Sequence, residues 1–451
     1  MALTILFFCI YIAIVIIIGI LSSKNETEED FMIANRKVSG LQVAATMSAG
    51  FFDWAVLSIY LAYIYQYWIS ATWMFIWSAL GFILLRRFFA ITIKRKADEI
   101  QAYTMPEYFY RMFGRYTWLA FSFILVFQYL LLMIVNFIIA WKVLSLIFPL
   151  PYFISVIIGW VIILTYLILA WFKAVIKTDF FQLIIMFIIS LTVAIFLFGK
   201  TSIPMSEFNM ISLWSGNLIW FLLLGSIGIL VAPDLWQRIF ATKDEKNLKR
   251  GLWYSAIILP LLAIIISIVG LTTKQFFPSI LPENALIIGF SKLLPLWLKE
   301  FWMVLLYAVA LSSSDTITFV ISSIFTRDLK NYTNKYSDSS MKTTTRIFML
   351  LFTCITVIIA IFYQNIIALW LSLWSLSLAL FPSILGSFYW KLNSKAVFWS
   401  LILSFVSVII IFIADKVTPE NAAISLPVSL ITLVTFQMVF KHKSSIINNI
   451  N

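Results

Sequence analysis

The sequence has few of the residues on which most enzymes and metal sites depend. It contains one histidine, His442, and two cysteines, Cys9 and Cys354, both within apolar runs. This argues against His-ligated zinc and against a disulfide framework. Charged residues make up only 12% of the 451 positions, and there is no glycine-rich nucleotide loop with a lysine. We therefore expect neither an enzyme nor a transporter driven by nucleotide hydrolysis.

What the chain has instead is apolar surface. Hydrophobic residues make up 62% of it and aromatic residues 17%. A soluble protein of this length needs more polar surface, so the composition indicates an integral membrane protein whose main contact is the lipid bilayer. The net charge of +12 does not indicate nucleic acid, because the basic residues lie in short loops rather than in one stripe or tail.

Thirteen apolar segments are long enough to cross a membrane, for which about 20 residues are needed. The first lacks a basic start and is longer than the usual apolar core of a signal peptide, so we expect it to be a retained span. The segments are 2–22, 41–66, 70–93, 117–146, 151–170, 175–199, 210–238, 249–272, 294–326, 345–364, 366–390, 395–414 and 422–440.

The loops between these segments alternate in charge. With the N-terminus outside, 26 of the 32 Lys and Arg residues fall on the inner side and five on the outer side, and Lys142 lies near the outer end of its span. Positive charge concentrates on the cytoplasmic side of membrane proteins. We therefore predict an inner (plasma) membrane protein with its N-terminus outside and its C-terminus in the cytoplasm.

Two polar interruptions stand out within the apolar segments. Residues 312–316 place three serines, an aspartate and a threonine at membrane depth, where such groups usually mark an ion or substrate path, and oxygen ligands suit a hard cation. Gly50 and Asp53 interrupt the second segment, where an unwound turn frees carbonyl oxygens for sodium. The alternative is a packing role, with Gly50 in a close helix crossing and Asp53 in a structural polar contact.

Four motifs in order resemble the sodium/solute symporter family. They are residues 30–39 (DFMIANRKVS), Ser48-Ala49-Gly50 with Asp53, residues 174–182 (AVIKTDFFQ), and residues 312–315 (SSSD) leading into residues 323–328 (SIFTRD). Residues 104–108, 237–241 and 250–251 add supporting matches. The first core helix looks most like the proline-symporter branch, although Ala55, Val56 and Leu57 depart from it.

The resemblance implies an all-α, LeuT-type fold in a single domain, residues 1–451. Ten core helices over 41–390 would form two inverted repeats of five, preceded by a leading helix and cytoplasmic loop (1–40) and followed by two trailing helices and a tail (391–451). The seventh segment would be the inverted partner of the second, with its own break at Gly225–Gly228.

The resemblance also implies a sodium site. Carbonyls of Phe51, Trp54 and Val309 and hydroxyls of Ser312 and Ser313 would hold the ion as a neutral oxygen shell. Some members of the family have an additional sodium site. By the resemblance, this second site would here involve Asp179, Asp315 and Thr316. Asp179 could instead be a cytoplasmic gate or a helix-capping residue.

The solute would bind nearby. Asp53, in the unwound turn, would hold sodium indirectly or meet a substrate amine. The remaining candidates for the solute pocket, by family position, are Ser58, Trp73, Trp77, Gln128, Trp220 and Ser226.

These observations predict a sodium-coupled symporter that imports a small organic solute by alternating access. Amino acids such as proline, carboxylates, sugars and osmolytes all remain candidates for the solute, and the oligomeric state stays open. The alternatives are a proton-coupled symporter of the same fold and a membrane sensor that binds solute without transporting it.

Overall fold

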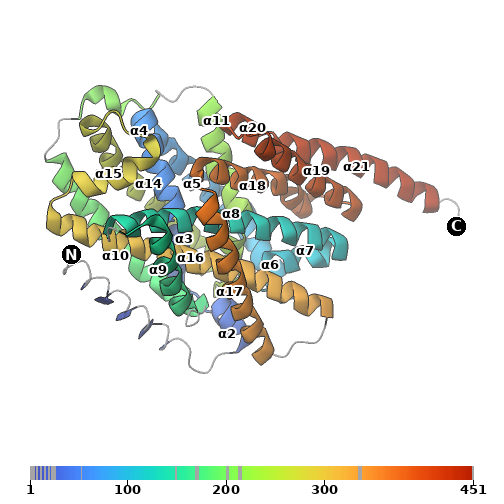
Figure 1. Cartoon of the computed structure of the whole chain (residues 1–451). Helices are drawn as coiled ribbons and strands as arrows, with labels where there is room; N and C mark the ends of the chain where they lie inside the picture. The colour runs from blue at the N-terminus through green and yellow to red at the C-terminus, as the bar shows by residue number, and fades with distance from the viewer. Residues whose placement is uncertain are drawn as a thin grey trace.

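The computed structural model describes residues 27–51, 53–147, 150–167, 172–199, 203–211, 216–333 and 338–448, with isolated positions between 6 and 21. In these ranges every regular element is a helix, and Val38 and Thr242 form an isolated β-bridge. The all-α prediction is confirmed (Figure 1).

The first half of the chain begins with the short α2 and η1, which are followed by α3 and then by one long apolar stretch before α8. The elements are α2 (Glu28–Ile33), η1 (Ala34–Arg36), α3 (Gly40–Phe51), α4 (Trp54–Tyr67), η2 (Trp68–Thr72), α5 (Trp73–Leu84), η3 (Leu85–Phe89), α6 (Ala90–Glu99), α7 (Met105–Phe113), α8 (Arg115–Ile147), α9 (Tyr152–Leu167) and α10 (Phe172–Phe198).

The second half repeats the alternation of short and long helices. Its elements are η4 (Met205–Phe208), α11 (Gly216–Leu222), η5 (Leu223–Ile227), α12 (Gly228–Val231), α13 (Pro233–Ala241), α14 (Glu245–Phe276), η6 (Pro282–Asn284), α15 (Ala285–Lys292), α16 (Leu296–Thr333), α17 (Asp338–Phe362), α18 (Ile366–Tyr389), α19 (Ser394–Ile413), α20 (Pro419–Ala422) and α21 (Ser425–Asn448).

Eight helices of the described ranges are long and apolar enough to cross a membrane, or nine if the bent pair formed by α11–α12 and α13 is one span. The predicted number of thirteen is thus not confirmed. One reason is that 41–66 and 70–93 are joined through η2, so that residues 55–99 form one long apolar stretch. Another is that most of segment 2–22 lies outside the described residues.

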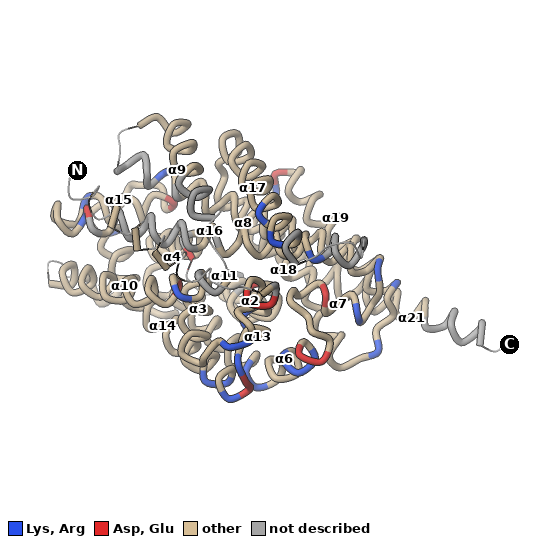
Figure 2. Tube along the Cα trace, turned by 90° about the horizontal axis from the view of Figure 1, so that it is seen from below, with Lys and Arg blue, Asp and Glu red and all other residues tan. Residues whose placement is uncertain are grey.

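The helices form one packed body (Figure 1). α3 packs on α14 and α10, and α16 packs on α8 and α17. The C-terminal helices α18, α19 and α21 pack on one another at one side of the body. Viewed from below, many of the charged residues gather around α2, α6, α7 and α13 (Figure 2).

Backbones approach closely where α5 crosses η5. An ideal Cβ at Gly225 would lie 2.7 Å from the Ser78 amide nitrogen, and one at Gly81 would lie 2.8 Å from the Gly225 carbonyl oxygen. No side chain fits at either position, so both residues must be glycine for the helices to touch. Small residues serve in this way at many membrane helix crossings.

Candidate functional site

The first helix break separates α3 from α4. α3 ends at Phe51 and α4 begins at Trp54. Asp53 caps α4, because its Oδ1 accepts a hydrogen bond from the Val56 amide at 2.7 Å. Nδ2 of Asn136, on α8, donates to Oδ2 of Asp53 at 3.3 Å. An aspartate at the N-cap stabilises the start of a helix, so the predicted interruption of the second segment is confirmed and has a local cause.

The second break lies at Ala232, between α12 and α13, where the chain bends by 46°. Ala232 is extended (φ −68°, ψ 112°), and α13 starts at Pro233, whose ring lacks an amide donor and favours the first helical position. The prediction placed this break at residues 225–228 and was wrong by a few residues. There the chain continues from the π-helical η5 into α12, and Gly225 serves the contact with α5 instead.

The two breaks border a buried cavity of about 50 Å³, together with α8 and α18. This is room for roughly four water-sized spheres of about 10–15 Å³ each. Its polar lining comes from Asp53, Gln128, Tyr129, Asp234 and Ser377, and its aromatic lining from Phe51, Trp370 and Trp374.

At the edge of the cavity lies a buried ionic cluster, which we call the Arg238 cluster: Thr46, Tyr129, Asp179, Asp234 and Arg238. Nη1 of Arg238 is 2.6 Å from Oδ2 of Asp234, and Nη2 is 3.4 Å from Oδ2 of Asp179 on α10. Nε of Arg238 donates to Oγ1 of Thr46 at 2.8 Å, and that hydroxyl donates to Asp179 at 2.6 Å. The Tyr129 hydroxyl donates to Asp234. The cluster therefore joins α3, α8, α10 and α13 beside the cavity.

Gly50 makes room for this cluster. An ideal Cβ at this position would lie 2.7 Å from Nη2 of Arg238 and 3.1 Å from its Cζ. Any side chain would push the guanidinium away from its carboxylates. Gly50 therefore has a packing role, but its close neighbour is the Arg238 side chain and not the backbone of a crossing helix, as the packing interpretation expected.

The residues predicted for the main sodium site lie at the first break and in the middle of α16. Phe51 and Trp54 flank the break, and α16, which carries Val309, Ser312 and Ser313, contacts α4. The Ser313 side chain is buried, whereas the side chains of Trp54, Val309 and Ser312 lie outside the described part of the structure. The assignment of these five residues to sodium stays a prediction.

The predicted second sodium site draws on Asp179, Asp315 and Thr316. Asp179 belongs to the Arg238 cluster, where it faces a guanidinium and a hydroxyl. The Thr316 side chain is buried on α16, and that of Asp315 lies outside the described residues. This site also stays a prediction, and a cation at Asp179 would meet Arg238 there.

Of the seven residues predicted for substrate or gating, Asp53 and Gln128 line the cavity. The other five are not among its lining residues: Ser58, Trp73, Trp77, Trp220 and Ser226. Trp73 stacks on Trp77 with ring centroids 5.5 Å apart, and its Nε1 donates to the Met210 carbonyl at 2.9 Å. The Ser226 hydroxyl donates to the Leu222 carbonyl within its own helix. Their roles stay predictions.

Sequence reasoning missed the contribution of α18. Trp370, Trp374 and Ser377 follow one another at helical spacing and all line the cavity. That i, i+4, i+7 pattern was available, but packing faces show the same pattern in an apolar helix. The sequence predicts no role for Arg238, which appears only in the supporting match at residues 237–241. Its partner Asp179 is 59 positions away, so no local pattern connects the two residues.

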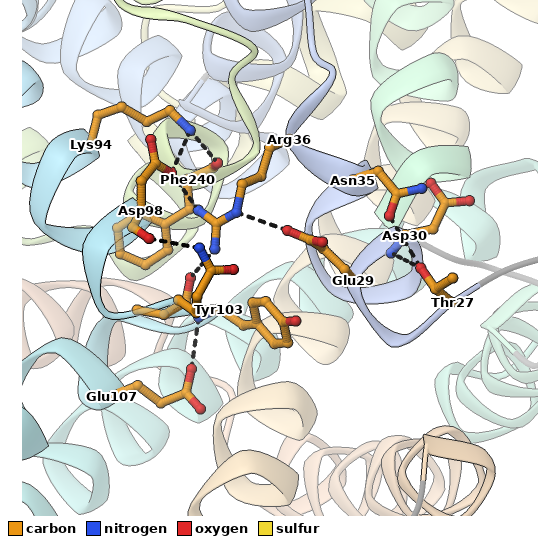
Figure 3. Close-up of polar contacts among 12 residues, drawn as sticks. Thr27, Glu29, Asp30, Asn35, Arg36, Lys94, Asp98, Tyr103, Glu107 and Phe240 are labelled. Carbon is orange, nitrogen blue, oxygen red and sulfur yellow. Dashed lines mark hydrogen bonds and ion pairs between the residues drawn. The ribbon is translucent and has the colours of Figure 1, made fainter.

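A second polar network surrounds η1, and Figure 3 shows Arg36 at its centre. Nε of Arg36 donates to Glu29 at 2.8 Å, Nη1 to Asp98 at 2.6 Å and Nη2 to the Ala102 carbonyl at 3.1 Å. Residues 34–36 have φ values of 50°, 51° and 53°. This left-handed conformation costs L-residues roughly 1–2 kcal/mol each, so the contacts of Arg36 hold a strained turn against the end of α6.

The same network reaches α7, α13 and α16. Glu107 accepts hydrogen bonds from the Tyr103 and Thr104 amides at the start of α7, and its Oε1 lies 2.5 Å from Nε of Arg327 on α16. Lys94 donates to the Phe240 carbonyl at the end of α13 at 3.0 Å. The network thus links the charged ends of helices that are far apart in the sequence.

Two interrupted helices that meet at a buried cavity, in an apolar and all-helical chain, are typical of secondary membrane transporters. Residues 31–215 and 205–404 match the sodium:solute symporter family. The chain belongs to this family, and the predicted resemblance is confirmed. No curated protein sequence matches the chain.

Solved structures of transporters share the fold. A Na⁺-coupled sialic acid symporter in a substrate-bound, outward-open state is 16% identical, with a TM-score of 0.82 over 97% of each chain. MhsT in complex with L-phenylalanine is 12% identical, with a TM-score of 0.52 over 88% of this chain and 97% of that one. The Eremococcus coleocola manganese transporter is 13% identical, with a TM-score of 0.52 over 92% and 94%. The LeuT-type fold is thereby confirmed.

Proposed function

We propose that the protein is a sodium-coupled symporter that imports a small organic solute by alternating access. The observation that carries the proposal is the buried cavity between the two helix breaks, lined by Asp53. Broken helices at the middle of the membrane are how many secondary transporters hold ions and solutes. Membership of the sodium:solute symporter family supports sodium as the coupling ion.

In this proposal the main sodium site uses the carbonyls of Phe51, Trp54 and Val309 and the hydroxyls of Ser312 and Ser313. The end of α3 at Phe51 leaves terminal carbonyls without helical partners, as at every helix end. The contact between α16 and α4 supports a site shared between them. A neutral oxygen shell suits an ion that must leave in every cycle.

The driving force is sufficient for accumulation. One elementary charge that moves through about 100 mV gains about 2.3 kcal/mol. At about 1.4 kcal/mol per factor of ten, this alone supports roughly 50-fold accumulation, and a sodium concentration gradient adds to it.

We further propose that the ends carrying α2, α6, α7 and α13 face the cytoplasm of an inner (plasma) membrane. The gathering of charged residues there supports this orientation (Figure 2), because basic residues concentrate on the cytoplasmic side. The N-terminus would then lie outside and the C-terminus inside.

The experiment is solute uptake and thermal unfolding of the full chain in sodium or potassium chloride at fixed pH. We expect sodium alone to raise the melting temperature and to be required for uptake. The Ser312→Ala/Ser313→Ala double variant should raise the sodium concentration for half-maximal response by about tenfold or more. Ser323→Ala is the matched control, because the Ser323 hydroxyl donates to the Val320 carbonyl of the same helix at 2.9 Å.

A response that follows the proton gradient and ignores sodium would replace this proposal with proton coupling. An equal effect of the double variant and of Ser323→Ala on the sodium response would remove the two serines from the ion site.

A further inference from the structure

The charged residues that line the cavity are of one sign, and the Arg238 guanidinium lies behind them at its edge. Its described lining contains two carboxylates, Asp53 and Asp234, and no lysine, arginine or histidine. The two carboxylates differ in their partners. Asp234 faces the Arg238 guanidinium at 2.6 Å and accepts from the Tyr129 hydroxyl, so its charge is compensated.

Asp53 is held by neutral donors. The hydrogen bonds to its side chain come from the Val56 amide and the Asn136 carboxamide, and among the described residues no cation forms an ion pair with it. The residue is only 3% exposed. An ionised carboxylate has about four acceptor sites, so it retains capacity for another donor. A buried charge without a counter-ion is costly, so a cation that enters the cavity is favoured beside it.

Polar atoms without partners line the same cavity. Oε1 of Gln128 and the indole nitrogens of Trp370 and Trp374 are buried and have no hydrogen-bond partner within the described structure. Gln128 is oriented by its Nε2, which donates to the Ser377 hydroxyl at 2.7 Å. Oε1 of Gln128 is an acceptor, so an N–H donor on a ligand in the cavity would complete it. The indole N–H groups are donors and do not bear on a cation.

The aromatic lining narrows the chemistry of that ligand. Trp370 and Trp374 meet at 72° with centroids 5.5 Å apart, and Phe51 lies on the wall formed by α3. Aromatic faces attract organic cations, whereas sodium requires a shell of several oxygens. A cavity of about 50 Å³ has room for a compact head group.

We infer that the transported solute carries an ammonium group, primary to quaternary, and has no net negative charge. The inference deepens the proposed symport function and rests on it. The ammonium lies between the Asp53 carboxylate and the indoles of Trp370 and Trp374. Where it has N–H groups, Oε1 of Gln128 accepts one. A net anionic solute is rejected, because it would bring negative charge to Asp53 without meeting a cationic side chain in the described lining.

The test measures the thermal stability of the full-length protein in sodium chloride and in potassium chloride with five probes. Choline is a cation, proline and glycine betaine are zwitterions, lactate is an anion and glucose is neutral. We expect at least one ammonium-bearing probe to stabilise the protein in sodium, and neither lactate nor glucose to do so. Stabilisation by lactate or glucose without any response to the ammonium probes overturns the inference.

Asp53→Asn tests the assigned residue without removing the helix cap, because asparagine caps helices as well as aspartate does. It should weaken the binding of the ammonium probe about 10- to 100-fold, the usual effect of losing one charge-assisted hydrogen bond. Stabilisation by sodium alone should persist. Asp244→Asn is the matched control, since Asp244 caps α14 outside the cavity by accepting from the Asn247 amide at 2.8 Å.

The outcomes separate the two proposals. If sodium and potassium act alike on the wild type, sodium coupling fails. If sodium acts but Asp53→Asn leaves the ammonium probe bound as before, the ammonium assignment fails alone. If the variant abolishes the response to sodium itself, Asp53 belongs to the ion and not to the solute.

Discussion

Arg238→Gln is the substitution that most directly tests the Arg238 cluster. It removes the guanidinium that the structure places against Asp179 and Asp234, and leaves both carboxylates buried. Breaking one side of a buried ion pair typically costs about 3–5 kcal/mol. We expect a loss of stability in that range.

The distances also predict which partner matters more. With an effective dielectric constant of about 20, charges at 2.6 Å attract by about 6 kcal/mol and charges at 3.4 Å by about 5 kcal/mol before desolvation. The short Asp234 contact is in addition a charge-assisted hydrogen bond with good geometry. Asp179 has a second partner in the Thr46 hydroxyl. The coupling of Arg238 to Asp234 should therefore exceed its coupling to Asp179.

The assay is a pair of double-variant cycles, one that combines Arg238→Gln with Asp234→Asn and one that combines it with Asp179→Asn. The free energy of unfolding of each variant is measured from its tryptophan fluorescence. Arg95→Gln is a matched control. Nε of Arg95 also lies 2.6 Å from a carboxylate, that of Glu245, but the two side chains are 65% and 38% exposed. An ion pair that is exposed to solvent contributes little to stability. If Arg238→Gln destabilises the protein no more than Arg95→Gln does, the reasoning about burial is refuted.

Two further substitutions test the same packing and the η1 network. Gly50→Ala should destabilise the protein by about 1–3 kcal/mol, because the added Cβ would lie 2.7 Å from the Arg238 guanidinium. Gly199→Ala is the control and should be close to neutral, because a Cβ there has no neighbour nearer than 3.6 Å. Equal melting temperatures for the two alanine variants would contradict this. Arg36→Lys should lower the free energy of unfolding by about 1–3 kcal/mol. The single ammonium group of lysine cannot reach the two carboxylates and the carbonyl that the planar guanidinium of Arg36 contacts. Arg115→Lys, on an exposed residue at the start of α8, provides the comparison.

The class of the protein and its first helix break could be predicted from the sequence. Scarce charge and long apolar segments determine the class, and Asp53 is a local signal, since a capping aspartate in an apolar run marks a helix start. The second break was misplaced because glycine permits both unwinding and close packing. Gly225 serves the second purpose, and the better signal was Pro233.

The charge pairing at the site could not be predicted in the same way. Asp179 lies on α10 and Arg238 on α13, and only the packing of α3 between them brings the two side chains together. The same holds for Gln128 and Ser377, which are 249 positions apart. A pattern along one helix indicates which face is polar, but the partner of that face depends on how the helices cross.

The crossing of α5 with η5 has a consequence for how the molecule moves. Backbone contacts at Gly81 and Gly225 leave no side chains between α5 and η5 that could rearrange. We therefore expect η5 and α12 to move with α5 as one rigid unit. On the other side of Ala232, α13 is clamped by Arg238 to α3 and α10. The extended residue Ala232, at the 46° bend, lies between this unit and α13. We therefore expect a rotation of one part against the other to change the backbone angles at Ala232.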